Sequence, residues 1–134
     1  MGHVKIVLLD SNIFYLGALS EYLSLFEEFE IVGEGKCVEE LRYSLGMTVP
    51  DIILAEYGFF NPDSAFGLNG LFNTHTTMRL LLMHFDLPVQ LLTKRKDDAR
   101  ISILSKDIAL DALVNRIVYI GSYCGTSSQS EPGW

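Results

Sequence analysis

Short apolar runs alternate with longer mixed segments along most of the chain. Five short runs rich in apolar residues occur, at 4–9, 29–33, 51–55, 79–83 and 101–104. Runs of this length, bounded by polar or turn-forming residues, are typical of strands that a parallel sheet buries on both faces. The pattern therefore predicts five strands.

The segments that follow the strands have the spacing of helices. Residues 12–26 carry apolar side chains on one face and predict an amphipathic helix, with Ser11 or Asn12 available as its N-cap. Residues 37–45 predict a shorter helix. A last helix follows Asp107, which can cap it, and places on one face Leu110, Leu113, Val114 and Ile117.

Two internal stretches and the end of the chain lack a regular pattern. Residues 57–78 contain a turn signal and several glycines, which disfavour a helix. Pro88 and the charged stretch after it predict that the fourth helix is short, shifted or missing. Residues 121–134 have no period and predict a flexible tail. We therefore expect one domain over residues 1–120.

The alternation of strands and helices predicts the fold class. A repeated strand–helix unit with right-handed crossovers gives an α/β fold in which helices cover both faces of a parallel sheet. We expect a doubly wound, flavodoxin-like (βα)5 domain with five parallel strands in the order 2-1-3-4-5.

Composition narrows the class further. The chain has 134 residues, of which 49% are hydrophobic, so it can bury an ordinary core. No apolar run approaches the roughly 20 residues of a membrane helix, and no signal peptide is apparent, so we expect a cytoplasmic protein without membrane contact. A net charge of −7 argues against direct nucleic-acid binding. Cys37 and Cys124 match no zinc or redox spacing.

Charged residues follow three of the predicted strands. Asp10 follows the first strand, Glu56 the third, and Lys106 the fifth. Because the carboxyl ends of parallel strands meet at one edge of a sheet, we expect these three side chains to converge there.

Several segments resemble the receiver domain of response regulators in two-component signalling. The resemblance rests on Val-Lys-Ile-Val-Leu-Leu-Asp-Ser-Asn-Ile-Phe-Tyr-Leu-Gly-Ala-Leu at 4–19, Phe-Glu-Ile-Val-Gly-Glu at 29–34, Pro-Asp-Ile-Ile-Leu-Ala at 50–55 and Leu-Ser-Lys-Asp at 104–107. It covers residues 4–120, strongly in the first 56 and at 101–118. It is closest to receivers that precede helix-turn-helix output domains. The resemblance implies a phosphorylation pocket at the strand ends.

The pocket departs from the family pattern at most of its positions. The family's two adjacent acids are Asp10 and Ser11 here, which removes one magnesium ligand. Glu56 stands where the family has its phospho-accepting aspartate. The position of the hydroxyl that contacts the phosphoryl group is His84, and the aromatic switch position is Ile103. Of the implied pocket, Asp10 and Lys106 keep the family's residue types.

These changes weaken each part of the phosphoryl chemistry. Mg²⁺ needs near-octahedral oxygen ligands, and Ser11 supplies no charge. The extra methylene of Glu56 displaces its carboxylate, and a shift of about 1 Å can cost on the order of 10²-fold in rate. We therefore expect no phosphorylation of Glu56 and no Mg²⁺ cofactor. We expect instead an ion pair between Glu56 and Lys106, and a hydrogen-bonded histidine at His84. Asp10 has two open roles, helix cap and residual metal ligand.

Three functions compete on this basis. The first is a phosphorylation-independent pseudo-receiver that acts in signalling or transcriptional control by binding a protein partner or a second copy. The second is a conventional phosphorelay receiver phosphorylated at the degenerate site. The third is a domain that binds a small molecule or metal at Asp10, Glu56 and His84, either as a regulator or as an enzyme. No other catalytic constellation is apparent in the sequence, so we favour the first function and expect no enzymatic activity.

Overall fold

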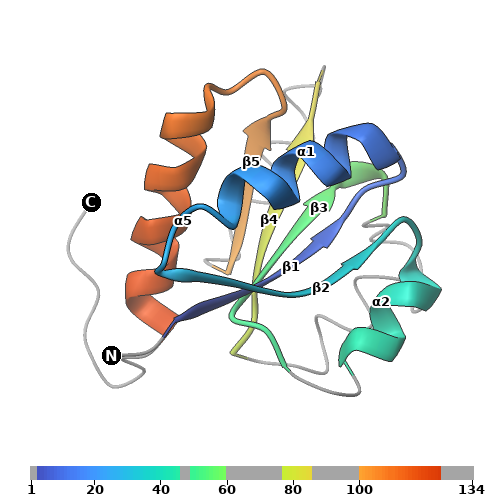
Figure 1. Cartoon of the computed structure of the whole chain (residues 1–134), viewed down its shortest axis with the longest axis horizontal. Coiled ribbons are helices and arrows are strands. Elements are labelled where there is room, and N and C mark those ends of the chain that lie inside the picture. The colour runs from blue at the N-terminus through green and yellow to red at the C-terminus, as the bar shows by residue number, and fades with distance from the viewer. Residues whose placement is uncertain (1–2, 46–48, 60–76, 86–99, 125–134) are drawn as a thin grey trace.

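Five parallel strands form the centre of the structure, a computed structural model that describes residues 3–45, 49–59, 77–85 and 100–124 (Figure 1). The strands are β1 (Val4–Leu9), β2 (Phe29–Gly35), β3 (Ile52–Glu56), β4 (Arg79–His84) and β5 (Ile101–Ser105). The described helices are α1 (Ile13–Leu23), α2 (Val38–Leu45), the one-turn η1 (Tyr57–Phe59) and α5 (Leu110–Cys124). The sheet order is β2-β1-β3-β4-β5, which confirms the predicted fold class.

The register of the sheet is regular except at one edge. β1 pairs with β3 from Ile6 opposite Ile52 to Leu9 opposite Ala55 without interruption. Between β1 and β2 the register shifts after Ile6, so that β2 contains one extra residue there. This bulge lies in the strand at the edge of the sheet.

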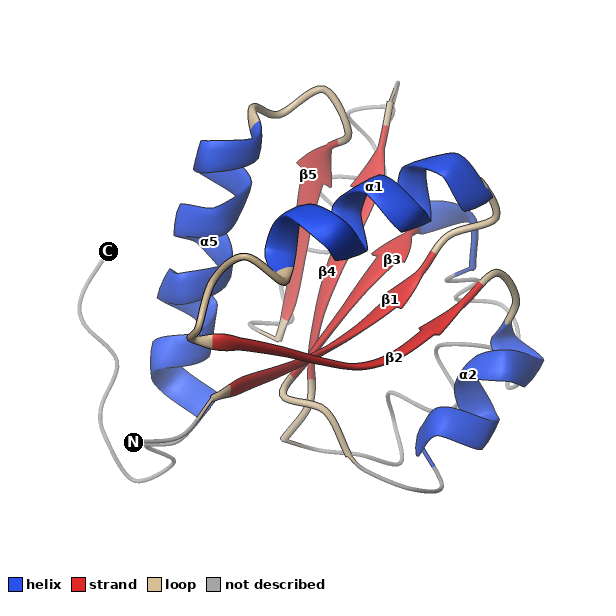
Figure 2. Cartoon of the chain, viewed as in Figure 1, coloured by secondary structure: helices blue, strands red, loops and turns tan. Residues whose placement is uncertain are grey.

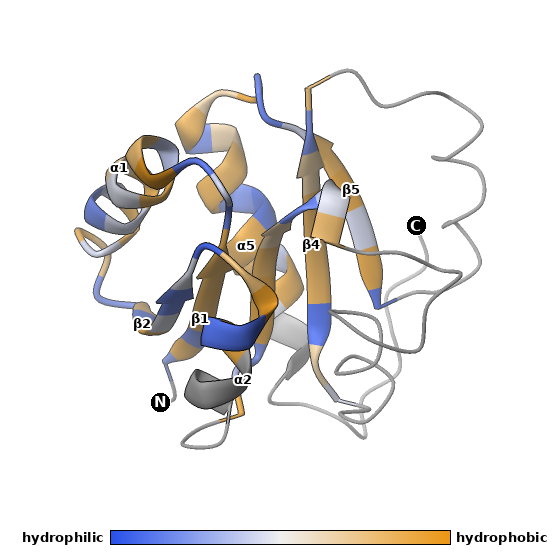
Figure 3. Cartoon of the chain, turned by 90° about the vertical axis from the view of Figure 1, so that its right-hand side faces the viewer, coloured by the Kyte–Doolittle hydropathy of each residue, from blue (hydrophilic) through white to orange (hydrophobic). Residues whose placement is uncertain are grey.

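Alternate strand residues bury their side chains in two separate cores. Ile6 and Leu8 of β1 face a core that α1 and α5 cover. Val7 and Leu9 face the opposite core, to which α2 contributes Leu41. Figure 2 shows α1 and α5 on one side of the sheet, and in Figure 3 β4 is coloured hydrophobic over most of its length and hydrophilic where it begins at Arg79. Burial on both faces explains why the central strands β1, β3 and β4 have nearly continuous apolar sequences.

The ends of α1 follow from the sequence around it. Asn12 is its N-cap and accepts hydrogen bonds from the backbone N–H groups of Phe14 (3.0 Å) and Tyr15 (3.2 Å), as predicted. The helix ends at Leu23, three residues before the predicted end at residue 26. Ser24 follows it and donates its backbone N–H to the Ser20 carbonyl.

The last helix differs from the prediction at both ends. α5 begins at Leu110, so Asp107 is not its cap. The backbone N–H of Asp107 instead donates to Ser105 Oγ at 3.0 Å within a turn. Leu110 is 45% exposed, whereas Leu113, Val114 and Ile117 are buried as predicted. The helix continues to Cys124, four residues beyond the expected domain end at residue 120.

The remaining predictions about irregular segments lie outside the described residues. These are the fourth helix between 86 and 99, most of the segment 57–78, and the tail after residue 124. In the part of the chain that is described, no helix combines the length and the apolar character needed to cross a membrane.

Candidate functional site

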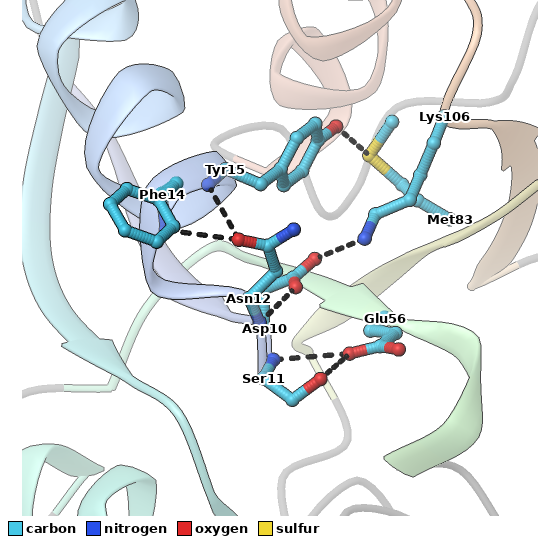
Figure 4. Close-up of polar contacts among 8 residues, drawn as sticks. All are labelled: Asp10, Ser11, Asn12, Phe14, Tyr15, Glu56, Met83 and Lys106. Carbon is cyan, nitrogen blue, oxygen red and sulfur yellow. Dashed lines mark hydrogen bonds and ion pairs between the residues drawn. The ribbon is translucent and has the colours of Figure 1, made fainter.

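The carboxyl ends of β1, β3 and β5 bring four predicted pocket residues together (Figure 4). Asp10 and Ser11 follow β1, Glu56 is the last residue of β3, and Lys106 follows β5. Hydrogen bonds and one ion pair connect these residues in two separate pairs. The strand ends therefore place the charged residues as the sheet topology predicts.

The first pair is a buried ion pair between Lys106 and Asp10. Lys106 Nζ lies 2.8 Å from Asp10 Oδ2, and the two side chains are 7% and 6% exposed. The other carboxylate oxygen of Asp10 accepts the backbone N–H of Asn12 at 2.8 Å. Asp10 therefore holds the entry to α1 in place, but it is not the helix cap, which is Asn12.

Two aromatic rings complete the surroundings of Lys106. Its Nζ lies 4.3 Å from the centre of the Tyr15 ring and 5.4 Å from that of Phe85, both within the range of cation–π attraction. Tyr15 donates its hydroxyl to Met83 Sδ at 3.7 Å. Burial, and secondarily the negative charge of Asp10, raise the pKa of Tyr15 to about 12. The Tyr15 side chain is thus uncharged at neutral pH and packs beside the Lys106–Asp10 ion pair.

The second pair joins Ser11 to Glu56. Glu56 Oε1 accepts the Ser11 hydroxyl at 2.8 Å and the Ser11 backbone N–H at 3.1 Å. Burial alone would raise the pKa of Glu56, but the two hydrogen bonds, with the positive charge of Lys106 and His84, lower it below 4.5. The carboxylate is therefore ionised at neutral pH and held by Ser11.

This arrangement corrects the expected ion pair between Glu56 and Lys106. Lys106 pairs with Asp10, which is only 4% exposed. A buried carboxylate has more to gain from a direct cation than one that stays partly accessible to water and has other donors. Glu56 has such donors in Ser11. Lys106 acts on it only through its charge.

The two remaining predicted positions lie on β4 and β5. His84 ends β4, is half-buried, and meets the ring of Tyr57 edge-on with 5.8 Å between ring centres. Its carbonyl accepts the Lys106 backbone N–H at 3.0 Å, which fixes the loop that carries the lysine. Ile103 is half-buried on β5, packs against the second core and has no polar group to change partners.

The oxygen atoms at the strand ends do not fit Mg²⁺. One Asp10 oxygen is directly paired with an ammonium group, and the serine hydroxyl points its hydrogen at Glu56. Mg²⁺ sites rely on carboxylates that are free to bind the ion and its waters. Among the described residues, no three His, Cys, Asp or Glu side chains gather in a way that could hold a metal.

A small internal cavity adjoins the ion pair. A cavity of about 10 Å³ lies beneath Asp10 between Tyr15, Leu54 and Met83. Such a volume admits about one water molecule.

Solved structures that resemble this chain are receiver domains of response regulators. The isolated receiver domain of RcsB from Salmonella enterica serovar Typhimurium has a TM-score of 0.75 at 13% identity, with 90% of each chain covered. The receiver domain of a putative response regulator NarL from Mycobacterium tuberculosis has a TM-score of 0.71 at 18% identity, covering 91% of this chain and 98% of that one. The fold is that of a receiver domain.

Other comparisons limit what this likeness means. A longer RcsB structure from the same Salmonella serovar, bound to the promoter rprA, has a TM-score of 0.76 at 13% identity, and the match spans only 61% of it. No protein-family model and no curated protein matches the sequence. At these identities the likeness concerns the receiver fold.

Sequence reasoning missed the roles of Ser11, Tyr15 and Phe85. By residue type Ser11 counts only as a lost acid, but its hydroxyl donates a hydrogen bond to the longer carboxylate of Glu56. Tyr15 lies in the helix predicted over residues 12–26, where its spacing indicates only a core contact; it packs against the core and also faces Lys106. One feature of the sequence could have indicated the Ser11–Glu56 contact. Both residues differ from the family pattern, and their positions are neighbours in the receiver pocket.

Proposed function

We propose that this chain is a receiver-like signalling module that acts by binding another protein, without being phosphorylated. The observation that carries the proposal is the contact between Ser11 and Glu56. The residue that replaces the second acid donates both its hydroxyl and its N–H to the residue that replaces the phospho-acceptor. The two substitutions thus compensate each other in a closed contact.

The charges of the site support the same proposal. Phosphoryl transfer requires a cation that is free to neutralise the incoming oxygens. Lys106 is instead engaged with Asp10 and covered by Tyr15 and Phe85. A phosphoryl group at Glu56 would have to displace Ser11 and compete with Asp10 for the lysine. The pocket acts as a fixed structural element rather than as an acceptor.

The setting of signalling or transcriptional control comes from the fold. The structures similar to this chain are receivers of response regulators, and one is bound to promoter DNA. Fold alone leaves the partner open. Net charge of −7 disfavours direct DNA contact by this domain, so the partner that we propose is a protein.

Phosphorylation tests the proposal directly. The protein is incubated with acetyl phosphate and Mg²⁺, or with beryllofluoride and Mg²⁺, and followed by intact mass and by amide NMR spectra. We expect no phosphoryl mass gain and no spectral change. A stoichiometric gain that disappears in Glu56→Gln would overturn the proposal and favour the conventional phosphorelay receiver.

A matched pair of variants shows whether the assay can detect a working pocket. Glu56→Asp alone shortens the side chain but leaves Ser11 neutral, so we expect it to stay inert. Ser11→Asp with Glu56→Asp restores both acids, and weak Mg²⁺-dependent labelling is expected only there, with His84 as the remaining obstacle.

A further inference from the structure

His84 adjoins both parts of the strand-end site. It ends β4, and Glu56 ends the neighbouring strand β3 one register position earlier. The backbone carbonyl of His84 accepts the Lys106 N–H at 3.0 Å, and its ring meets the Tyr57 ring edge-on. The histidine therefore lies beside the Ser11–Glu56 pair and also holds the loop that carries the lysine.

A histidine at this position can change the charge of the site. Histidine is the side chain that ordinarily changes its charge between about pH 5 and 8, whereas carboxylates and lysines keep theirs in that range. Asp10 and Lys106 neutralise each other as an ion pair. The site therefore carries the negative charge of Glu56 while His84 is neutral, and these four groups together are neutral once His84 is protonated.

The surroundings of His84 decide which group a protonated ring would bind. Lys106 repels it, but this charge is already paired with Asp10 at 2.8 Å. Glu56 is ionised at neutral pH, and its carboxylate and His84 interact through their charges. An imidazolium is therefore drawn toward Glu56. Among the described residues, the titratable groups near the ring are Glu56 at the end of β3, Tyr57 in η1, and Lys106 and the exposed Asp107 in the loop after β5, with Asp10 behind the lysine.

Glu56 has an oxygen atom available for this contact. Both hydrogen bonds from Ser11 end on Oε1 (Figure 4), so within the described residues Oε2 receives none. The Ser11 donors are neutral groups, whereas an imidazolium adds the direct attraction of an opposite charge. A protonated His84 therefore competes with Ser11 for the carboxylate.

We propose that protonation of His84 is a signal to which this module responds, and that the imidazolium binds Glu56 and draws its carboxylate away from Ser11. While His84 is neutral, Ser11 and Glu56 keep the closed contact seen in the structure. Regulation then comes from a proton at His84 and needs no phosphoryl group at Glu56. This inference rests on the proposed function and names the regulation of the same site.

The contact between Ser11 and Glu56 joins two parts of the fold, so its release has consequences beyond the two side chains. Ser11 stands between β1 and α1, and its N–H and hydroxyl both bind the end of β3. Loss of these bonds frees the segment that enters α1 from β3. Protonation of histidines shifts pH-sensitive proteins between two arrangements by local charge changes of this kind.

A pH titration followed by NMR tests the proposal. The Ser11 amide, the Glu56 carboxyl carbon and the His84 ring are observed in isotope-labelled protein between about pH 5 and 8. We expect the Ser11 amide signal to move with the same midpoint as the His84 ring. Glu56 takes up its own proton only below 4.5, because its pKa is lowered, so its protonation does not produce this change.

Variants identify the groups responsible. His84→Gln should abolish the change at the Ser11 amide between about pH 5 and 8. His3→Gln is the matched control and should preserve it, since His3 is an exposed histidine before β1 whose Nδ1 lies 2.7 Å from the Glu27 carbonyl oxygen. In Glu56→Gln the His84 ring still titrates, but the Ser11 amide should no longer follow it. This last variant keeps the test decisive if His84→Gln does not fold.

Three results would overturn the inference. They are a Ser11 amide that stays unchanged between about pH 5 and 8, a change that persists in His84→Gln or is lost in His3→Gln, and a Ser11 amide that still follows His84 in Glu56→Gln. Phosphoryl mass is measured on the same samples. Labelling of Glu56 there would refute the proposed function, whereas a missing response to His84 would refute only the pH signal.

Discussion

Removal of the Lys106 charge should be among the most destabilising single changes near the strand ends. In Lys106→Met the side chain keeps most of its length, but Asp10, which is 4% exposed, loses its cation. Breaking a buried pair from one side typically costs about 3–5 kcal/mol, because the other charge is left uncompensated. The Asn12 N–H still donates to Asp10, which favours the lower end of that range.

Other contacts of Lys106 set the expected value. Its cation–π contacts with Tyr15 and Phe85 are each worth roughly 0.5–1 kcal/mol at partly exposed sites, and both are lost. Added to the lower end of the range for the broken pair, these contacts give an expected loss of about 4–5 kcal/mol in the free energy of unfolding. This is a large part of the roughly 5–15 kcal/mol that domains of this kind possess.

Urea unfolding followed by far-UV circular dichroism measures this loss. Lys5→Met serves as the matched control, since Lys5 is an exposed lysine on β1 and should cost no more than about 0.5 kcal/mol. The double variant Asp10→Asn with Lys106→Met removes both charges and should recover more than about 1 kcal/mol relative to Lys106→Met alone. The slope of the transition should not change.

The reasoning fails if Lys106→Met lowers the free energy of unfolding by less than about 1 kcal/mol. It also fails if the double variant loses more free energy of unfolding than the two single variants lose in sum. Either result would mean that Asp10 does not depend on the lysine.

Three further predictions concern other groups. The hydrogen bonds that lower the pKa of Glu56 below 4.5 stabilise the fold at neutral pH, and this stability is lost as the pH falls through the folded-state pKa. Ser11→Ala should therefore raise the NMR titration midpoint of Glu56. It should reduce the free energy of unfolding only at pH values above that range. An unchanged midpoint would show that the Ser11 hydroxyl does not lower the pKa of Glu56. Tyr15, with its pKa raised from 10.0 to about 12, should ionise after an exposed tyrosine in an ultraviolet titration, and its contribution to stability should be lost as pH rises through that value. Gly121→Ala would place a Cβ 2.6 Å from Val4 Cγ2 and should destabilise by about 1–3 kcal/mol, which thermal unfolding would detect; a neutral result would show that β1 yields at its start.

The sequence was sufficient for the fold because the three central strands, β1, β3 and β4, are buried on both faces. Continuous apolar runs such as Ile52–Ala55 appear only where helices cover both sides of a sheet, and this fixes both the strands and their parallel arrangement. Helix ends were harder to predict. Asp107 is a good capping residue by type, but its N–H turns back to Ser105 and the helix begins three residues later.

The partners within the site could not be predicted from residue types alone. The sequence brings Asp10, Glu56 and Lys106 to one edge, but two carboxylates compete there for one lysine. The outcome depends on which carboxylate is more deeply buried and which has other donors nearby. Burial of Asp10 and the double hydrogen bond from Ser11 to Glu56 are properties of the folded backbone.

The extra residue in β2 has a consequence for how copies of this protein meet at high concentration. β2 is an edge strand, and an edge strand offers unpaired backbone groups to which another chain can add as a further strand. Here the register shift opposite Ile6 and Val7 interrupts that row, and Glu30 and Glu34 add exposed charges on either side of it. Bulges and charges of this kind discourage edge-to-edge aggregation. The β2 edge is therefore a poor template for the addition of another strand, which disfavours fibre-like growth from this edge. Copies of the protein can still contact one another through their helical surfaces.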